Sequence, residues 1–228
     1  MGAWDFFARA VQSMGAAGSE AFDRLRGAVG TGPQAREAAF SMAVVALAAK
    51  MARADGVVTM SEATTFWSRF DVPPDAVKPI RRLFELAQQD VAGFEAYAQK
   101  IADLFPDDDA VREDILDILF TIAAADGVLH EAEDAFLTRV AEIFALDGVR
   151  VNRVKARHLS PDGDPYALLG VSPNMPLDEI RRKWRELVTE HHPDMLIARG
   201  VPPEFVKIAN DRLAVINAAY EAIVRHAE

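Results

Sequence analysis

The tripeptide His192-Pro193-Asp194 places an imidazole and a carboxylate on either side of a proline. Both groups can carry charge and can form hydrogen bonds with a partner. Pro193 lacks a backbone N–H and biases His192 away from helical φ and ψ, so we expect a helix to end there and the tripeptide to form an exposed turn. Because most such tripeptides are only turns, the surrounding sequence decides whether this one has a function.

A compact group of basic residues precedes the tripeptide. Apolar residues recur at spacings of three and four from Leu177 to Val188, which predicts a helix with one apolar stripe. The opposite face carries basic side chains: Arg181, Arg182, Lys183 and Arg185. Such a run is often a solvated face, but the chain as a whole is acidic, with 25 Lys and Arg against 35 Asp and Glu and a net charge of −10. A positive patch in this setting favours contact with an acidic partner surface.

The segment around the tripeptide is predicted to be a helical hairpin. Residues 205–223 form a second periodic run, long enough for a helix of about five turns. Two apolar stripes joined by a turn make an antiparallel hairpin, and a short helix at residues 166–171, stopped by Gly170, would close its core. We expect Pro176 to be the first residue of the helix before the tripeptide, and residues 195–201 to be a connector.

Further motifs lie in register with the tripeptide: Asp164-Pro165-Tyr166-Ala167-Leu168-Leu169-Gly170-Val171, Trp184-Arg185, and Ile216-Asn217-Ala218-Ala219-Tyr220. Together they resemble the J domain of DnaJ-type co-chaperones, from about residue 162 to the C-terminus. The resemblance implies that His192, Pro193 and Asp194 activate ATP hydrolysis by a DnaK-type chaperone, and that the basic residues dock on that partner. The sequence lacks the usual lysine after Asp194.

The first two-thirds of the chain contain an internal repeat. The motif Ala54-Asp55-Gly56-Val57-Val58, with Glu62 beyond, recurs as Ala125-Asp126-Gly127-Val128-Leu129, with Glu133 beyond. The glycines suit helix C-terminal stops, and a glutamate at this spacing suits a capping box at the start of the next helix. An EF-hand is excluded, because Met51 and Arg53 would occupy its first ligand positions.

The repeated region resembles the TerB-like family associated with tellurite resistance, and this resemblance implies a shared divalent metal site. The matching positions are Asp55, Glu62, Asp126 and Glu133. Helix capping and metal binding therefore both stay open for these carboxylates. We expect no other cofactor.

Every periodic segment of residues 33–158 is typical of helix, which predicts an all-α domain. The expected helices span residues 34–53, 60–70, 75–91, 93–104, 108–125, 131–145 and 147–157. Residues 1–32 are expected to be a partly helical tail, residues 159–163 a linker and residues 164–228 the J domain. A TerB-like helical bundle followed by a C-terminal J domain is the arrangement of the DjlA family.

Composition argues against several classes of protein. The chain has no cysteine, so it has neither disulfides nor thiolate zinc sites. Its acidity argues against binding nucleic acid. The sequence shows no phosphate-binding glycine loop, so we do not expect an enzyme. The longest nearly apolar run, residues 38–49, is too short for a membrane span, which needs about 20 residues. We expect a cytoplasmic protein, peripheral to the inner membrane at most.

Two functions compete at this point. The first is a co-chaperone whose J domain stimulates a DnaK-type ATPase while the TerB-like domain selects a location or a protein client. The second is a metal- or stress-responsive interaction protein in which the J segment is only an adaptor. Stimulation of the partner ATPase separates the two.

Overall fold

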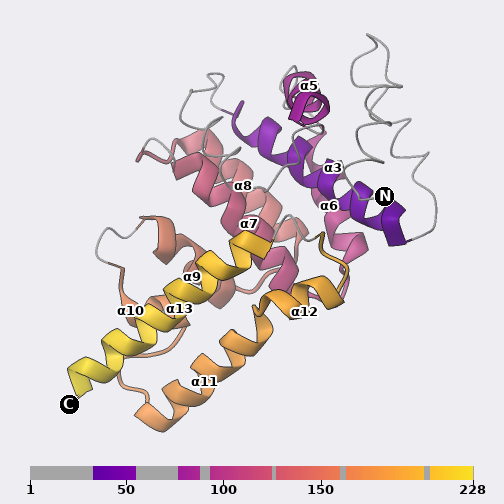
Figure 1. Cartoon of the computed structure of the whole chain (residues 1–228). Coiled ribbons are helices and arrows are strands. Elements are labelled where there is room, and N and C mark those ends of the chain that lie inside the picture. Colours follow the sequence, from indigo (N-terminus) through magenta and orange to yellow (C-terminus); the bar gives the residue numbers. More distant parts are fainter. Residues whose placement is uncertain are drawn as a thin grey trace.

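The computed structural model describes residues 33–54, 77–87, 93–124, 127–159, 163–202 and 206–227, and all regular secondary structure in these ranges is helical. This confirms the all-α prediction. The N-terminal part contains α3 (Pro33–Met51), α5 (Val77–Ala87), α6 (Phe94–Leu104), α7 (Asp109–Ala123), α8 (Glu131–Ile143) and α9 (Gly148–Leu159). The C-terminal part contains α10 (Pro165–Leu169), α11 (Leu177–Glu190), α12 (Pro193–Ala198) and α13 (Val206–Ala227) (Figure 1).

Helix bounds agree with the sequence predictions to within a few residues wherever the structure describes them. The predicted helix at residues 60–70 and the tail at residues 1–32 lie outside the described ranges. Pro176 was expected to be the first helical residue, but it is the N-cap residue, with an extended ψ of 140°, and α11 begins at Leu177.

The expected connector after the tripeptide is partly helical. Pro193 is the first residue of α12, a position that suits proline because its fixed φ is helical and a first-turn N–H would have no helical partner. The His192 side chain caps this helix by accepting a hydrogen bond from the backbone N–H of Asp194. Pro193 therefore starts a helix as well as following the end of another.

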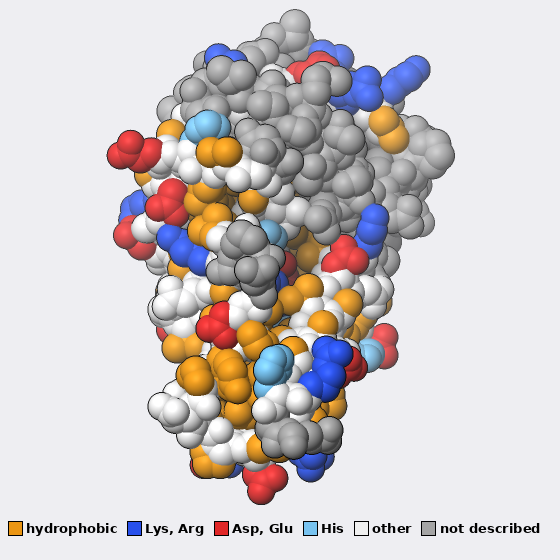
Figure 2. Space-filling model, turned by 90° about the vertical axis from the view of Figure 1, so that its left-hand side faces the viewer, with side chains coloured by type: hydrophobic (Ala, Val, Ile, Leu, Met, Phe, Trp, Pro, Cys, Tyr) orange, Lys and Arg blue, Asp and Glu red, His pale blue; other side chains and the backbone are white. Residues whose placement is uncertain are grey.

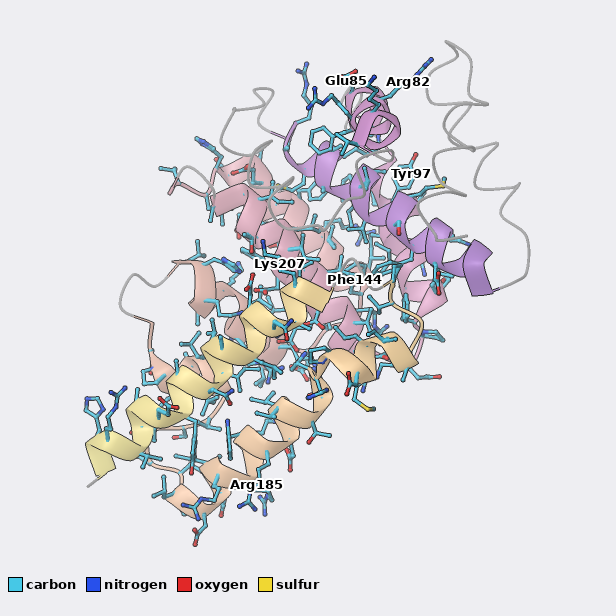
Figure 3. All side chains as sticks on the ribbon, in the orientation of Figure 1. Arg82, Glu85, Tyr97, Phe144, Arg185 and Lys207 are labelled. Carbon is cyan, nitrogen blue, oxygen red and sulfur yellow. The ribbon has the colours of Figure 1, made fainter. Side chains whose placement is uncertain are left out.

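Helix α3 is the centre of the N-terminal domain. Its side chains from Ala39 to Met51 are all buried, as expected for a helix that is apolar on every side. It packs against α5, α6, α7 and α8, and Phe40 makes an edge-to-face contact with Phe105, with ring centroids 5.3 Å apart. Figure 3 shows Phe144 in the interior of this helical bundle.

The C-terminal hairpin has a core of its own, which is connected to the first core through α9. The hairpin core consists of residues from α9, α10, α11 and α13: Ala156, Leu168, Leu169, Ile180, Leu187, Ile216, Ala219 and Ile223. Helix α9 contributes Ala156 to this core and Val154 to the core around α3. One helix is thus shared by the two parts of the chain.

The tip of the hairpin belongs to the core around α3. Leu196 of α12 and Ile208 at the start of α13 are buried in that core. They face Phe40 and Val111 across a gap of about 10 Å³. Figure 1 shows α13 running from the free end of the hairpin to α7, with α12 beside it. Figure 2 shows the face on the α9 and α10 side, where hydrophobic side chains gather at the height of the hairpin.

Gly170 lies where α10 approaches α9. Its φ of 64° is in the left-handed region that glycine adopts without steric cost. A Cβ added to it would lie 2.9 Å from Cγ1 of Val149 and 3.7 Å from Nη1 of Arg153. The close approach of the two helices therefore requires a residue without a side chain.

We predict that Gly170→Ala lowers the free energy of unfolding by more than Gly127→Ala. Both positions have positive φ, which costs alanine roughly 1–2 kcal/mol, but nothing lies within 4 Å of a Cβ at Gly127. Urea unfolding of both variants measures the difference. Equal losses would mean that the α9–α10 junction does not depend on this close approach.

Candidate functional site

The tripeptide forms an exposed turn where α12 begins: His192 is the N-cap residue of α12, and Pro193 and Asp194 are its first two residues. His192 has an extended backbone, with φ −67° and ψ 135°. Its Nδ1 accepts a hydrogen bond from the Asp194 backbone N–H at 3.2 Å, and the same nitrogen lies 3.7 Å from Oδ2 of Asp194. The side chains of His192 and Asp194 are 47% and 87% exposed. The turn therefore has a defined conformation and stays open to a partner.

A groove of about 560 Å³ adjoins the turn. Its lining combines basic, acidic and apolar side chains from α11, α12 and the residue after α12: Arg182, Arg185, Glu186, Thr189, Glu190, Met195 and Arg199. Figure 3 shows Arg185 on the outer face of α11. The groove is thus formed by two of the four docking residues that the sequence indicated, by other residues of α11 and by the segment that follows the tripeptide.

The basic residues of α11 do not act as one group. Arg182 and Arg185 line the groove. Arg181 instead donates a hydrogen bond from Nε to the hydroxyl of Tyr220, at 3.0 Å. The Nζ of Lys183 lies 3.6 Å from Oε2 of Glu186. The structure therefore brings two of the four residues together beside the turn.

Five groove residues were not predicted from the sequence: Glu186, Thr189, Glu190, Met195 and Arg199. Met195 and Arg199 lie in the stretch that was expected to be a plain connector, and α12 carries Met195 into the groove and ends beside Arg199. The sequence does contain a signal for helix α12, because a proline followed by an aspartate, as at Pro193 and Asp194, is typical of the first turn of a helix.

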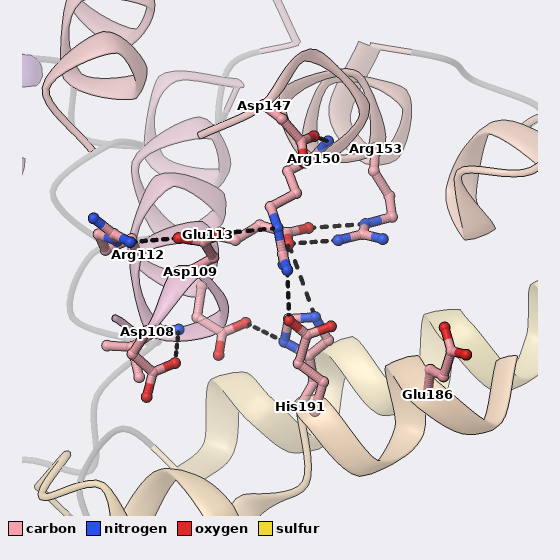
Figure 4. A network of polar contacts seen from close by, with 12 residues as sticks. Asp108, Asp109, Arg112, Glu113, Asp147, Arg150, Arg153, Glu186 and His191 are labelled. Carbon is pink, nitrogen blue, oxygen red and sulfur yellow. Dashed lines mark hydrogen bonds and ion pairs between the residues drawn. The ribbon is translucent and has the colours of Figure 1, made fainter. Parts of the chain in front are cut away.

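A buried ion-pair network lies directly behind the turn (Figure 4). Its centre is Glu113 of α7, whose side chain has no exposed surface. Arg153 donates to it from Nε at 2.9 Å and from Nη2 at 2.5 Å, and Arg150 donates from Nη1 at 2.8 Å. Arg212 of α13 also donates to Glu113, and it donates to Asp114 as well. The network therefore joins α7, α9 and α13.

Electrostatics keep Glu113 ionised. Burial by itself raises the pKa of its carboxyl, but Arg212 and Arg153 outweigh that effect and hold the pKa well below its usual range. The carboxylate therefore carries its full charge over the neutral pH range.

His191 joins the tripeptide to this network. Its ring is completely buried, with Nδ1 3.2 Å from Oδ1 of Asp114 and Nε2 3.9 Å from Oε2 of Glu113. Burial lowers the pKa of His191 to about 4, although Glu113 acts in the opposite direction. The ring is therefore neutral near pH 7.

One residue in the sequence does indicate the network. Arg212 follows Ala209 and precedes Ile216 at spacings of three and four, so it occupies a position of the apolar stripe of α13. Arginine is almost never fully buried unless it is paired. A buried acidic partner could therefore have been expected, although its identity could not.

Three of the four metal candidates, Asp55, Glu62 and Asp126, lie outside the described residues. Glu133 is buried, and its Oε2 accepts a hydrogen bond from the His130 backbone N–H at 2.9 Å, in the geometry of a capping box. No group of three or more metal-ligating side chains occurs within the described ranges. Capping is thus observed at Glu133, and metal binding stays a prediction.

We predict that Glu133→Ala lowers the free energy of unfolding by roughly 0.5–2 kcal/mol, equally with and without a chelator, because it removes a helix cap. Glu131→Ala, an exposed change in the same first turn, should cost less. Thermal unfolding measures both. A wild-type melting temperature that falls on adding chelator, with Glu133→Ala no longer responding, would favour the metal site.

Helices of the described ranges include none that is long and apolar enough to cross a membrane.

Comparisons with known proteins match two separate parts of the chain. Residues 41–156 match the family described as Tellurite resistance protein TerB, and residues 164–227 match the DnaJ domain. The co-chaperone protein DjlA of Shewanella oneidensis is 28% identical, over 82% of this chain and 78% of its own length. That of Vibrio cholerae serotype O1 is 24% identical, over 86% of this chain and 82% of its own.

A shorter match has a higher identity. The DjlA protein of Legionella pneumophila is 52% identical over 25% of this chain and 20% of its own length. No solved structure matches the chain. The order of a TerB domain and a C-terminal DnaJ domain, together with these relatives, shows that the chain belongs to the DjlA-like family of J-domain co-chaperones.

Proposed function

We propose that this J-domain co-chaperone docks on a DnaK-type chaperone and stimulates its ATP hydrolysis through His192, Pro193 and Asp194. The observation that carries the proposal is the exposed turn with its capped conformation, next to a groove that holds two of the predicted docking arginines. An exposed imidazole and carboxylate offer hydrogen bonds to a partner. The chain itself makes no covalent change in this scheme.

The groove suits an acidic partner surface with an apolar contact. Arg182 and Arg185 supply positive charge on one side, and Met195, which is 40% exposed, supplies apolar surface on the other. Charged patches of opposite sign accelerate encounter, and a buried apolar contact slows dissociation. The TerB-like domain would then direct the complex to its location or to protein clients.

The alternative of a metal- or stress-responsive adaptor has no specific observation in its favour within the described residues, since Glu133 is engaged in capping. The chelator experiment above tests its metal component. A cytoplasmic location remains a prediction from the sequence.

We predict that His192→Gln and Asp194→Asn each abolish stimulation of the partner ATPase while the fold is retained. Both side chains are exposed. Asp194→Asn should change the free energy of unfolding by less than about 0.5 kcal/mol, and His192→Gln by no more than the roughly 0.5–2 kcal/mol of a lost helix cap. Steady-state ATP hydrolysis, with the host's DnaK-type chaperone at matched concentrations, measures the loss.

The matched controls are His226→Gln and Asp178→Asn, the same chemical changes at exposed positions of the same hairpin away from the turn. Both should stimulate as the wild type does. Full stimulation by either turn variant would contradict the proposal.

We further predict that reversing Arg182 and Arg185 to Glu weakens stimulation more than reversing Arg181 and Lys183. Only the first pair lines the groove, and charge steering acts mainly on the association rate. Added salt should weaken wild-type stimulation, because exposed charges are screened within about 10 Å at 0.1 M salt. Association rates from stopped-flow binding measure both effects. Equal losses for the two pairs, or no response to salt, would show that the groove is not the docking surface.

A further inference from the structure

The end of the hairpin that carries the turn packs against the TerB-like domain. The hairpin's own core ends at residues such as Leu187 and Leu169. Beyond it, toward the turn, the buried apolar residues Leu196 and Ile208 belong to the core around α3. The TerB-like domain therefore supplies the packing that the J segment lacks at the turn.

Both ends of the segment that carries the tripeptide are held by α7 or the residue that caps it. At one end, His191 is buried between Glu113 and Asp114. At the other end, Nε of Arg199 lies 3.1 Å from Oδ2 of Asp108, the residue that caps α7.

The two ends are also tied to each other, because Arg199 donates a hydrogen bond from Nη1 to the carbonyl of Glu190 at 3.0 Å. Only the part between these ends, with His192 and Asp194, is exposed. The contacts surround the turn and do not cover it, which suits a positioning role and not an inhibitory one.

Helix α13 is held at the same place. The Arg212 side chain is completely buried and donates to both Glu113 and Asp114. Arg150 of α9 links Glu113 to the end of α11. It donates a hydrogen bond to Glu113, and its Nη2 donates to Oε1 of Glu190 at 2.7 Å. Helices α9 and α13 and the end of α11 thus converge on two neighbouring carboxylates of α7, Glu113 and Asp114.

We propose that the TerB-like domain holds the His192-Pro193-Asp194 turn in its partner-binding conformation, with Asp114, Glu113 and Arg212 as positioning residues for stimulation. This inference rests on the proposed function. It assigns the TerB-like domain a direct part in stimulation, in addition to any role in location or client choice. It also makes stimulation depend on side chains that a docked partner does not touch, since Asp114 is only 5% exposed.

The test uses Asp114→Asn in the full chain, a substitution that keeps the shape of the side chain and removes its charge. ATP hydrolysis by the DnaK-type partner is measured against co-chaperone concentration. If the turn is in the binding conformation for a smaller fraction of the time, the apparent affinity of the co-chaperone for its partner falls by the same factor. We expect the half-saturating concentration to rise on the order of tenfold, with the same maximal stimulation. Arg212→Met, which also removes a donor to Glu113, should raise the half-saturating concentration at least as much. The double variant should show less than the sum of the two effects, because both changes remove the contact between Arg212 and Asp114.

The matched control is Asp117→Asn, the same substitution one turn further along α7. Asp117 pairs with Arg157 and His158 of α9 and not with the hairpin. The Asp117→Asn variant should leave the half-saturating concentration unchanged, even if it lowers the melting temperature. An equal rise in this control would reduce the effect to general destabilisation and overturn the inference.

Amide hydrogen exchange gives a second readout that needs no partner. The backbone N–H of Leu196 donates to the carbonyl of His192, and that of Arg199 to Met195. Exchange at Leu196 and Arg199 should accelerate in Asp114→Asn and stay unchanged in Asp117→Asn. If it is unchanged in both, the network does not hold the turn.

A milder variant covers the case in which Asp114→Asn does not fold. Asp108→Asn keeps an oxygen to cap α7, where Asp108 accepts from the Val111 N–H, but it loses the charge pair to Arg199. Its half-saturating concentration should rise about threefold, and no rise would overturn the inference.

The proposed function and this inference fail differently. A wild-type chain without any stimulation overturns both. Stimulation that requires His192 but is the same in Asp114→Asn overturns only the positioning role.

Discussion

A buried carboxylate needs compensating positive charge, and Glu113 receives it from three arginines on two helices, α9 and α13. Its oxygens accept hydrogen bonds from Arg150, Arg153 and Arg212. Removing one member of such a group leaves uncompensated charge in the interior, which typically costs about 3–5 kcal/mol. That is a large part of the roughly 5–15 kcal/mol by which a domain is stable. The relative placement of α7, α9 and α13 therefore depends on this one residue.

The same constraint accounts for the features around it. Because α9 brings Arg150 and Arg153 to Glu113, it lies between the two cores and contributes to both. The close approach of α10 to α9 then requires glycine at position 170. The end of α11 packs against α7, with Nδ1 of the buried His191 ring 3.2 Å from Oδ1 of Asp114, and the exposed turn begins at the next residue. The position of the turn thus follows from the contacts of Glu113 and Asp114, and not from the hairpin alone.

The features that the sequence predicted well are local. Apolar periodicity located the helices, Gly170 marked the end of α10, and Pro193 marked the turn, because each depends on neighbouring residues. The network could not be found in this way. Glu113 and Arg153 are 40 residues apart, and Glu113 and Arg212 are 99 apart, so no local pattern connects them. Charged residues on amphipathic helices are usually solvated, and only Arg212, within an apolar stripe, contradicted that expectation. Helix α12 was missed because Pro193 was interpreted only as the end of a helix.

Scanning calorimetry of the full chain tests the central claim that the TerB-like domain and the J segment form one cooperative unit around Glu113. A shared core and a shared ion-pair network predict a single heat-absorption transition whose calorimetric and van't Hoff enthalpies agree. Two separable transitions, one for each domain, would contradict it, because the J segment would then be folded and held independently of the TerB-like domain.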